Sequence, residues 1–286
     1  MMLFLTQYAK NFPTANKTMI TMSSSPEYTC QGSGTPVIML HSSMSSKEQW
    51  LKLSSRLNSD FHTIAIDLYG YGGCKAPKDP SSFTLSKEAR RIDDIVTKLI
   101  GTEHFHLVGH SYGGATALCF AHTNPERLIS LSLFEPVAFH LLAKQDPARA
   151  IILKLAEDIS TYIDKEKHSL ATEMFVDFWS GKGTYKSLRK SKRSFLDGFI
   201  KKVALDFQAG INEPLTIKEY QQIQIPICLI RGAQSPLPTR QITYNLEATL
   251  SQMETHQVDG GHMSPISHAN IVNRIWETFI RSKQLD

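Results

Sequence analysis

The sequence LVGHSYGG, from Leu107 to Gly114, is the most informative part of this chain for its fold. It carries the pattern GxSxG, formed by Gly109, Ser111 and Gly113, directly between an apolar strand-like run and a helical pattern. A serine on so sharp a strand-to-helix turn has a strained backbone, and small neighbours are needed for the chain to fit. A plain Gly/Ser turn is the alternative, but this context favours Ser111 as a nucleophile.

Apolar strand-like runs alternate with helical patterns on both sides of this stretch. PVIML, HTIAID and FHLVGH each precede a helical pattern, and LISLSLF forms the next apolar run. Such alternation predicts βαβ units and a parallel sheet. The expected helices cover residues 47–57, 86–100 and 113–122, and, after two further strand-like runs, IPICLIRG and THQVDGGH, residues 240–251 and 270–282.

The alternation lapses after Val137, and mainly helical signals follow until about Gln222. The simplest architecture is one α/β sheet, made by residues 28–139 and 223–286, interrupted by a helical insertion at residues 140–222. Residues 1–27 are rich in Thr, Ser, Asn and Met and lack periodicity, which predicts a loose N-terminal extension.

The composition is that of an ordinary globular domain, with 41% hydrophobic and 20% charged residues. The net charge of +4 is too weak to indicate a nucleic-acid partner. Four cysteines without metal or CxxC spacing favour reduced thiols and a cytoplasmic protein, and the short run MMLFL is neither signal peptide nor membrane span. His104 and His106 alternate along one strand but lack a third ligand, so we expect no metal site. We also expect no cofactor.

Three further motifs accompany LVGHSYGG: MLHSSMSS at 39–46, DLYGYGGC at 67–74 and VDGGHMSP at 258–265. Together they resemble the α/β-hydrolase superfamily over residues 28–286. Ser42 replaces the usual glycine of the family's oxyanion loop, and Cys74 replaces the usual serine of its DxxGxGxS turn. The resemblance implies a mostly parallel sheet with helices on both faces, and it implies that the helical insertion is the family's cap.

The resemblance also assigns catalytic roles. Ser111 would attack a carbonyl carbon, and His262 would take its proton and return it to the leaving group. The backbone N–H groups of Ser43 and Tyr112 would bind the developing oxyanion. Two other histidines near these motifs are interpreted as structural: His41 and His110.

The third member of the triad departs from the commonest family pattern. An acid usually follows the strand ICLIRG in a GxxD sequence, but here the fourth residue is Ser235, which cannot hold imidazolium charge. Glu135 ends the strand after the nucleophile helix, where some relatives carry the acid, and we predict that it accepts a hydrogen bond from His262. There are three alternatives. The acid could be Asp259, or it could be a carboxylate from the cap, or the site could be a Ser–His dyad helped by Ser235 or water. Pro136 predicts an extended backbone at Glu135. In the alternative, purely structural interpretation, the Glu135 carboxylate only caps nearby backbone amides.

A serine nucleophile implies acyl transfer to water through an acyl-enzyme, unlike the aspartate of dehalogenases and epoxide hydrolases. Hydrolysis of a small ester, thioester or lactone is therefore the leading hypothesis. Carbon–carbon bond hydrolysis, perhydrolysis and a catalytically weakened ligand-binding protein on the same fold are the alternatives.

Two weaker patterns lie in the expected cap. Phe178 and Trp179, with Phe175 at helical spacing, and Ser42 in the oxyanion loop are candidate pocket residues, although such an aromatic stripe is more often packing. The run KSLRKSKR, residues 186–193, has five positive charges and no acid. It is interpreted as a solvated helix face, with an anionic substrate entrance or a membrane surface as the alternative.

Overall fold

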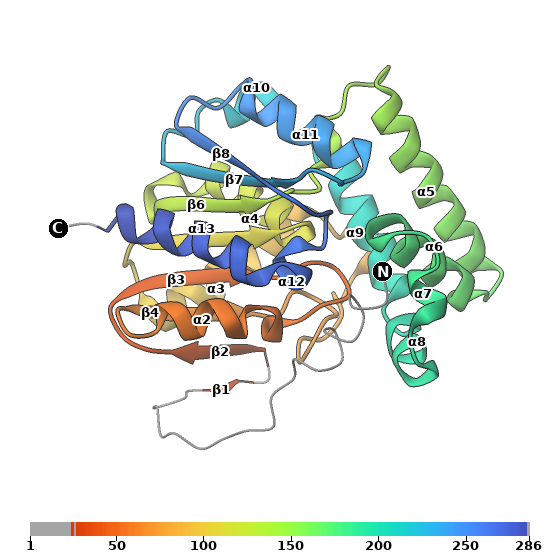
Figure 1. The fold of residues 1–286 in the computed structure, drawn as a ribbon, viewed down its shortest axis with the longest axis horizontal. Coiled ribbons are helices and arrows are strands. Elements are labelled where there is room, and N and C mark those ends of the chain that lie inside the picture. Colours follow the sequence, from red (N-terminus) through yellow and green to blue (C-terminus); the bar gives the residue numbers. More distant parts are fainter. Residues whose placement is uncertain (1–23, 26, 285–286) are drawn as a thin grey trace.

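A computed structural model describes residues 24–25 and 27–284, which form an eight-stranded sheet in the order β1-β2-β4-β3-β5-β6-β7-β8 (Figure 1). β2 pairs antiparallel with β1 and β4, and all other neighbours are parallel. The strands are β1 (Ser24–Ser25), β2 (Tyr28–Gln31), β3 (Thr35–Leu40), β4 (Phe61–Ile66), β5 (Phe105–His110), β6 (Leu128–Phe134), β7 (Ile227–Gly232) and β8 (Met253–Val258).

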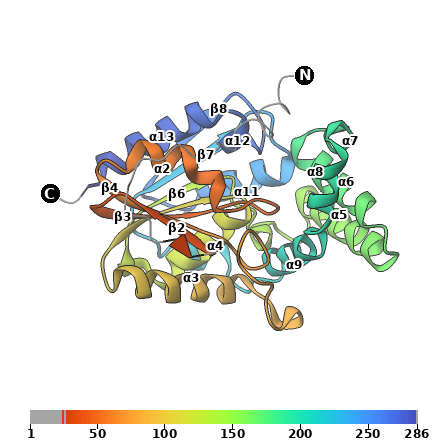
Figure 2. The same ribbon diagram turned by 90° about the horizontal axis from the view of Figure 1, so that it is seen from below.

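Helices cover both faces of the sheet (Figure 2). The helices α3 (Leu85–Ile100), α4 (Tyr112–Thr123) and α11 (Leu237–Glu247) pack on one face, and α2 (Leu51–Leu57) and α13 (Ala269–Ser282) on the other. The remaining short elements of this core are α12 (Ser264–Ser267) and the 3₁₀ helices η1 (Lys47–Trp50), η2 (Pro80–Ser82), η3 (Pro125–Arg127) and η4 (Phe139–Leu141). The predicted fold class, a mostly parallel α/β sheet with helices on both faces, is confirmed.

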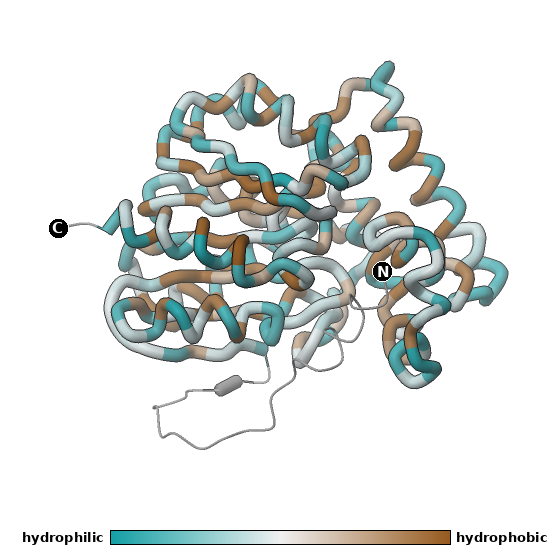
Figure 3. Tube along the Cα trace, viewed as in Figure 1, coloured by the Kyte–Doolittle hydropathy of each residue, from teal (hydrophilic) through white to brown (hydrophobic). Residues whose placement is uncertain are grey.

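The central strands form because their residues are apolar on both faces. Every residue of β5 is buried, and β3, β4, β6 and β7 each have a single residue that is not fully buried. This is the pattern of a parallel sheet covered twice. Polar and apolar segments alternate along α13, whose apolar side packs Trp276 against Trp50 with ring centroids 5.5 Å apart (Figure 3).

Residues 140–222, which we call the helical segment, connect β6 to β7. They form α5 (Pro147–Asp164), α6 (His168–Ser180), α7 (Thr184–Ser187), α8 (Lys190–Asp197), α9 (Ile200–Ile211) and α10 (Ile217–Tyr220). Asp146 begins α5 by accepting a hydrogen bond from the Ala148 N–H at 2.8 Å. Figure 1 shows α5 to α9 grouped at one end of the sheet, where β5 and β6 also end. In the described part of the chain, no helix is both long and apolar enough to cross a membrane.

Some boundaries differ from the sequence predictions. Ser24–Ser25 fall in the expected extension but pair with β2, while residues 1–23 lie outside the described part of the chain. α11 begins at Leu237 rather than 240, because Pro236 and Pro238 fit the first turn of a helix. The four cysteines are all unpaired and buried, as expected for reduced thiols.

Candidate active site

Ser111 lies on the turn between β5 and α4, at the carboxyl end of the sheet. Its φ of 57° is in the left-handed region, which is strained for a residue with a side chain. The two flanking glycines have no room for a larger side chain. A Cβ on Gly109 would lie 2.6 Å from the Gly113 oxygen, and one on Gly113 would lie 2.3 Å from the Leu40 oxygen. The GxSxG pattern is therefore what allows this turn to form.

His262 follows β8 and faces Ser111. Its Nε2 lies 2.8 Å from Ser111 Oγ, so the ring nitrogen accepts the hydroxyl proton in a hydrogen bond. The backbone before it is held by β7, because the Gln234 N–H donates to the Gly260 oxygen at 2.7 Å. His110 Nε2 donates to the His262 carbonyl at 2.9 Å. The ring is thus held in hydrogen-bonding contact with the serine.

Glu135 lies immediately after β6 and is fully buried. Its Oε2 accepts the Nδ1–H of His262 at 2.8 Å, and its Oε1 accepts the N–H of Gly232 at 2.7 Å. The expectation of an extended backbone at this residue is wrong, since its φ is +40°. The Glu135 N–H donates to the Ile230 oxygen at 3.2 Å, and this contact with β7 accompanies the left-handed conformation despite Pro136.

The alternatives to Glu135 do not reach the histidine. Asp259 accepts a hydrogen bond from Gln234 Nε2 at 3.2 Å on the surface. Ser235 Oγ is buried without a hydrogen-bond partner. Among the described residues, Glu135 is the carboxylate that contacts the His262 ring. The hydrogen-bonded row Ser111–His262–Glu135 has the geometry of a serine triad, while the catalytic roles of its members stay predictions.

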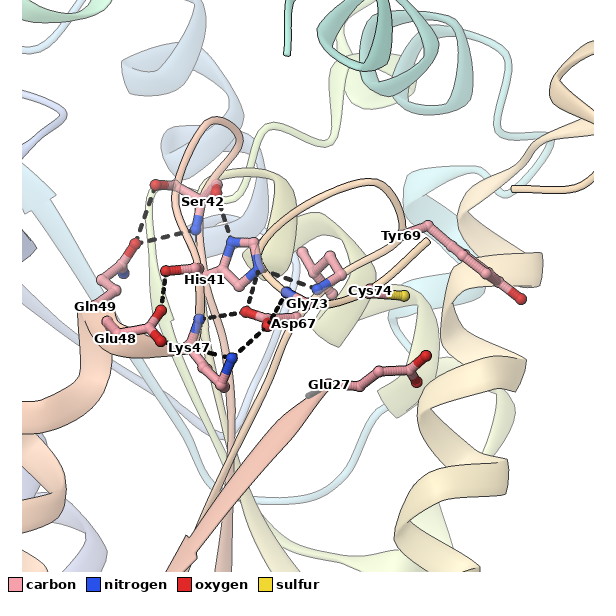
Figure 4. A network of polar contacts seen from close by, with 12 residues as sticks. Glu27, His41, Ser42, Lys47, Glu48, Gln49, Asp67, Tyr69, Gly73 and Cys74 are labelled. Atoms are coloured by element: carbon pink, nitrogen blue, oxygen red, sulfur yellow. Dashed lines mark hydrogen bonds and ion pairs between the residues drawn. The ribbon is translucent and has the colours of Figure 1, made fainter. Parts of the chain in front are cut away.

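The loop after β3, residues 41–46, runs beside Ser111 and carries the two expected site serines. The Ser42 N–H and Ser42 Oγ both donate to Gln49 Oε1 at 3.1 Å, as Figure 4 shows. Gln49 Nε2 in turn donates to His110 Nδ1 at 3.2 Å. Since the Ser42 N–H is engaged by Gln49, the next amide along the loop, that of Ser43, is the better candidate to face a substrate. Gln49 is not among the predicted site residues, because no motif in the sequence marks it.

His41 fixes the start of this loop to the turn after β4. Its Nδ1 donates to the Ser42 carbonyl at 2.7 Å (Figure 4). Its Nε2 accepts the Leu68 N–H at 3.0 Å. Complete burial lowers the pKa of His41 to about 4 and that of His110 well below its usual value. Both rings are therefore neutral at pH 7 and bound to backbone or amide groups, which agrees with their interpretation as structural.

The DxxGxG turn is organised around the buried carboxylate of Asp67. It accepts the Lys47 N–H at 2.6 Å, Lys47 Nζ at 2.8 Å and the Gly73 N–H at 2.8 Å. A Cβ on Gly72 would lie 2.2 Å from this carboxylate, so only glycine fits there. The motif thus has a structural role. It binds the start of η1 to the turn after β4 and so supports the loop that carries Ser42 and Ser43.

A cavity of about 580 Å³ opens over Ser111 and His262. Ser42 and Ser43 line it from the sheet side, the segment around His262 lines it as well, and the helical segment adds a mostly apolar wall. The indole ring of Trp179 lies over the His262 ring, with centroids 4.4 Å apart. The expected pocket residues all line this cavity: Ser42, Phe175, Phe178 and Trp179.

In the basic run at residues 186–193, some side chains face solvent and one lines the cavity. Lys186 is exposed and pairs with Glu173 at 2.7 Å, and the Arg193 guanidinium lies 5.8 Å from the centroid of the Tyr185 ring. Lys192 lines the cavity, and burial lowers its pKa. The expected solvated face therefore describes only part of the run.

One group of potential metal ligands occurs among the described residues. Ligand atoms of Cys228, Glu254 and His256 lie within 4.8 Å of one another on β7 and β8. None of the three lines the cavity over Ser111, and burial raises the pKa of the Cys228 thiol, which disfavours the thiolate that a metal needs. His104 is exposed, whereas His106 is buried and bonded to Ser130 Oγ at 2.8 Å. We assign no metal role to these residues.

Comparison with known sequences places this geometry in a family context. A family model described as the alpha/beta hydrolase fold matches residues 35–269. The chain is 30% identical to a haloalkane dehalogenase of Agrobacterium fabrum over 152 residues, which are 52% of this chain and 49% of that protein. It is also 30% identical to a probable lysophospholipase of Arabidopsis thaliana, BODYGUARD 2, over 42% of this chain and 26% of that protein. The matches thus span about half or less of these relatives.

Solved structures resemble the chain over nearly its whole length. A thermophilic esterase from Thermogutta terrifontis has a TM-score of 0.71 at 19% identity, over 95% of this chain and 100% of that one. MGS-M2, from a deep-sea metagenome library of the Medee basin, has a TM-score of 0.76 at 16% identity, over 91% and 95%. At this level of identity the likeness demonstrates a shared fold.

Proposed function

Because the chain belongs to the alpha/beta hydrolase fold family, we propose that it is a cofactor-independent serine hydrolase. It cleaves a small ester, thioester or lactone through an acyl-enzyme. The observation that carries this proposal is the hydrogen-bonded row from Ser111 Oγ through both ring nitrogens of His262 to Glu135, with 2.8 Å at each step. The relatives' own substrates do not enter the proposal.

The first half of the reaction forms the acyl-enzyme. Ser111 Oγ attacks the substrate carbonyl carbon while its proton passes to His262 Nε2. Glu135 stabilises the imidazolium through Nδ1, and the N–H groups of Ser43 and Tyr112 bind the oxyanion. His262 then gives the proton to the leaving oxygen or sulfur, and the bond to the acyl carbon breaks.

The second half regenerates the serine. Water takes the place of the leaving group, and His262 removes a proton from it as it attacks the acyl carbon. The tetrahedral intermediate collapses, the acid leaves, and Ser111 recovers its proton from His262. Besides the substrate and water, each step uses only side chains and backbone groups of this chain, so the proposal includes no cofactor.

We assign residues 140–222 to a lid over the site, joined to a hydrolase core of residues 28–139 and 223–286. The placement of Phe175, Phe178 and Trp179 in the cavity wall over Ser111 supports this role. An apolar wall suits an acyl chain and excludes water from the oxyanion. The small-molecule acyl substrate, the cytoplasmic location and the lack of a nucleic-acid partner stay predictions.

The nucleophile separates this proposal from the dehalogenase chemistry of a relative. Haloalkane dehalogenases and epoxide hydrolases of this superfamily use an aspartate on the elbow, and this chain has Ser111 there. A carboxylate attacks alkyl carbon, whereas an activated serine is suited to acyl carbon. Carbon–carbon hydrolysis and perhydrolysis use the same serine triad and remain the alternatives.

A fluorophosphonate probe with intact-mass detection tests the proposal. We expect the wild type to gain one covalent label at Ser111, and a panel of p-nitrophenyl esters, lactones and a diketone to identify the bond class. Ser111→Ala should lose labelling and lower kcat by at least roughly 10⁴-fold, with Tm close to the wild type. An unlabelled wild type with saturable ligand binding would instead favour the ligand-binding alternative.

A further inference from the structure

Two charged residues of the helical segment enter the core beside the active site. Lys202 and Asp206 lie one turn apart on α9 and are 6% and 5% exposed. Asp206 Oδ2 accepts the Ser43 hydroxyl at 2.6 Å and the Tyr71 hydroxyl at 2.5 Å. Its other oxygen, Oδ1, bonds to Lys202 Nζ. One carboxylate of the lid therefore holds the side chain of a candidate oxyanion residue.

Lys202 reaches the second candidate oxyanion residue. Its Nζ lies 4.6 Å from the ring centroid of Tyr112, the residue that follows the nucleophile. The rings of Tyr71 and Phe83 surround it at 4.8 and 4.7 Å, a cage that suits a cation. Glu88 Oε2, which accepts the Tyr112 hydroxyl at 3.3 Å, lies 4.0 Å from the same Nζ.

The core is shaped to receive this lysine. Gly70, in the DxxGxG turn, has a φ of +73°, and a Cβ there would lie 3.1 Å from Lys202 Cγ. The glycine suits its left-handed backbone conformation, and a larger residue would also crowd the lysine stem by a few tenths of an ångström. A residue of the hydrolase core motif is thus fitted to a side chain of the lid.

Stability alone gives a poor account of this cluster. Burial raises the pKa of Asp206 and of Glu88, which reflects the cost of keeping charges away from water. Buried ion pairs are frequently no more stable than apolar packing of equal volume, so they indicate stability only weakly. Their geometry, in contrast, fixes positions closely, because each hydrogen bond has a preferred length and direction.

We propose that Lys202 and Asp206 are positioning residues that hold the two oxyanion donors in place, so that the lid completes the oxyanion hole. The inference rests on the proposed serine hydrolase function. Asp206 fixes the loop that carries the Ser43 N–H, and Lys202 packs on the residue that carries the Tyr112 N–H. The loop needs such a hold, because Met44, next to Ser43, is itself in the left-handed region with a φ of 58°.

The test compares two aspartates of the helical segment with similar partners. Asp206→Asn weakens the hold on Ser43 and Tyr71. Asp197→Asn is the matched control, since Asp197 accepts the Ser169 hydroxyl at 2.7 Å and the Tyr185 hydroxyl at 2.9 Å away from the cavity. Ser43→Ala is the milder variant, because it removes the hydroxyl bonded to Asp206 and keeps the backbone N–H.

The readouts are the rate of Ser111 labelling by the fluorophosphonate, which also develops charge on an oxygen, and kcat and KM for a p-nitrophenyl ester. We expect Asp206→Asn to lower the labelling rate and kcat by roughly 10- to 100-fold with KM nearly unchanged, as for a weakened oxyanion hole. Ser43→Ala should lower both by about fivefold, and the double variant should be no worse than Asp206→Asn alone, since the contact that Ser43→Ala removes is already disrupted in Asp206→Asn. Asp197→Asn should stay within about twofold of the wild type.

Wild-type rates in folded Ser43→Ala and Asp206→Asn, or equal losses in Asp206→Asn and Asp197→Asn, would overturn the inference. If Asp206→Asn does not fold, a wild-type labelling rate in Ser43→Ala would overturn it and the expected loss would support it. Failure of the wild type itself to be labelled would contradict the proposed function instead, so the two failures are distinguishable.

Discussion

The ends of β6 and β7 lie side by side in the sheet, yet only one carries an acid. The strands pair in parallel, with Phe134 opposite Ile230, and both end at the edge where Ser111 lies. β6 ends in Glu135, whose carboxylate bonds to His262. β7 ends at Gly232, and no acid follows in the next three residues; the Ser235 side chain there is buried without a hydrogen-bond partner.

The ends of β6 and β7 hold His262 in different ways. The residues directly after β7 support the His262 loop through their backbone, since the Ala233 N–H donates to the Val258 oxygen at 3.0 Å and the Gln234 N–H donates to the Gly260 oxygen at 2.7 Å. β6 supplies the charge, and the Gly232 N–H of β7 orients it at 2.7 Å. The comparison shows that an acid from either strand can face one histidine, because parallel strands end at a common edge.

Among the substitutions at these two strand ends, Glu135→Gln should change kcat the most. The amide keeps the shape but has one oxygen for two donors, the Gly232 N–H and the His262 Nδ1–H. If the oxygen serves Gly232, the amide N–H₂ faces Nδ1 and moves the ring proton to Nε2, where Ser111 needs an acceptor. We expect kcat to fall by roughly 10²–10⁴-fold, measured on the best ester of the panel.

Ser111→Ala is the reference for zero turnover in that measurement, and a Tm within a few degrees of the wild type shows that the fold is kept. A kcat within about threefold of the wild type would mean that Glu135 only orients backbone. A dyad helped by water would then replace the triad.

A smaller change in kcat, this time an increase relative to Glu135→Gln, should follow when the acid is moved to the end of β7. In Glu135→Gln/Ser235→Asp the carboxylate stands where many relatives carry it. Ser235 Oγ lies 2.7 Å from the position of a Cβ on Gly232, and the Gly261 carbon lies 2.9 Å from the same position. The new carboxylate is therefore near the His262 loop, and we expect about a tenfold gain in kcat over Glu135→Gln.

Ser235→Asp alone is the control for that recovery, because two buried carboxylates at one histidine repel each other and should lower stability. If the double variant gains nothing while it remains folded, the β7 end is too far from Nδ1. In that case the two strand ends are not equivalent supports for an acid.

Much of this site could be predicted from sequence because its parts follow local rules. GxSxG, DxxGxG and the His262 loop each contain glycines at which a Cβ would clash, namely Gly109, Gly113, Gly72 and Gly260, so the pattern is visible in the chain. Glu135 was recognisable as a charge ending an apolar strand. Its left-handed backbone was not, since that conformation accompanies contacts with Gly232 and His262, which are far away in the sequence.

The supports that sequence analysis missed come from distant segments without a motif. Gln49 binds the loop from η1, and Asp206 binds it from α9, 163 positions beyond Ser43. Lys202 and Asp206 follow an ordinary i, i+4 helix pattern, which usually indicates an exposed ion pair. Only the packing of α9 against the core turns that pair inward, and packing between distant segments cannot be derived from local periodicity.

Ser235→Ala should change kcat and stability the least of these variants. Its hydroxyl oxygen is buried without a hydrogen-bond partner, so the wild type already bears the desolvation cost of an unpaired polar atom. Removing that atom leaves no other group unpaired, and we expect a change in unfolding free energy of about 0–1 kcal/mol in favour of the variant. Because Glu135 and not Ser235 contacts the His262 ring, kcat should stay within about twofold of the wild type. Urea denaturation and ester kinetics measure the two quantities. A loss of more than tenfold in kcat would show that Ser235 assists the histidine, and β7 would then contribute chemistry as well as backbone support.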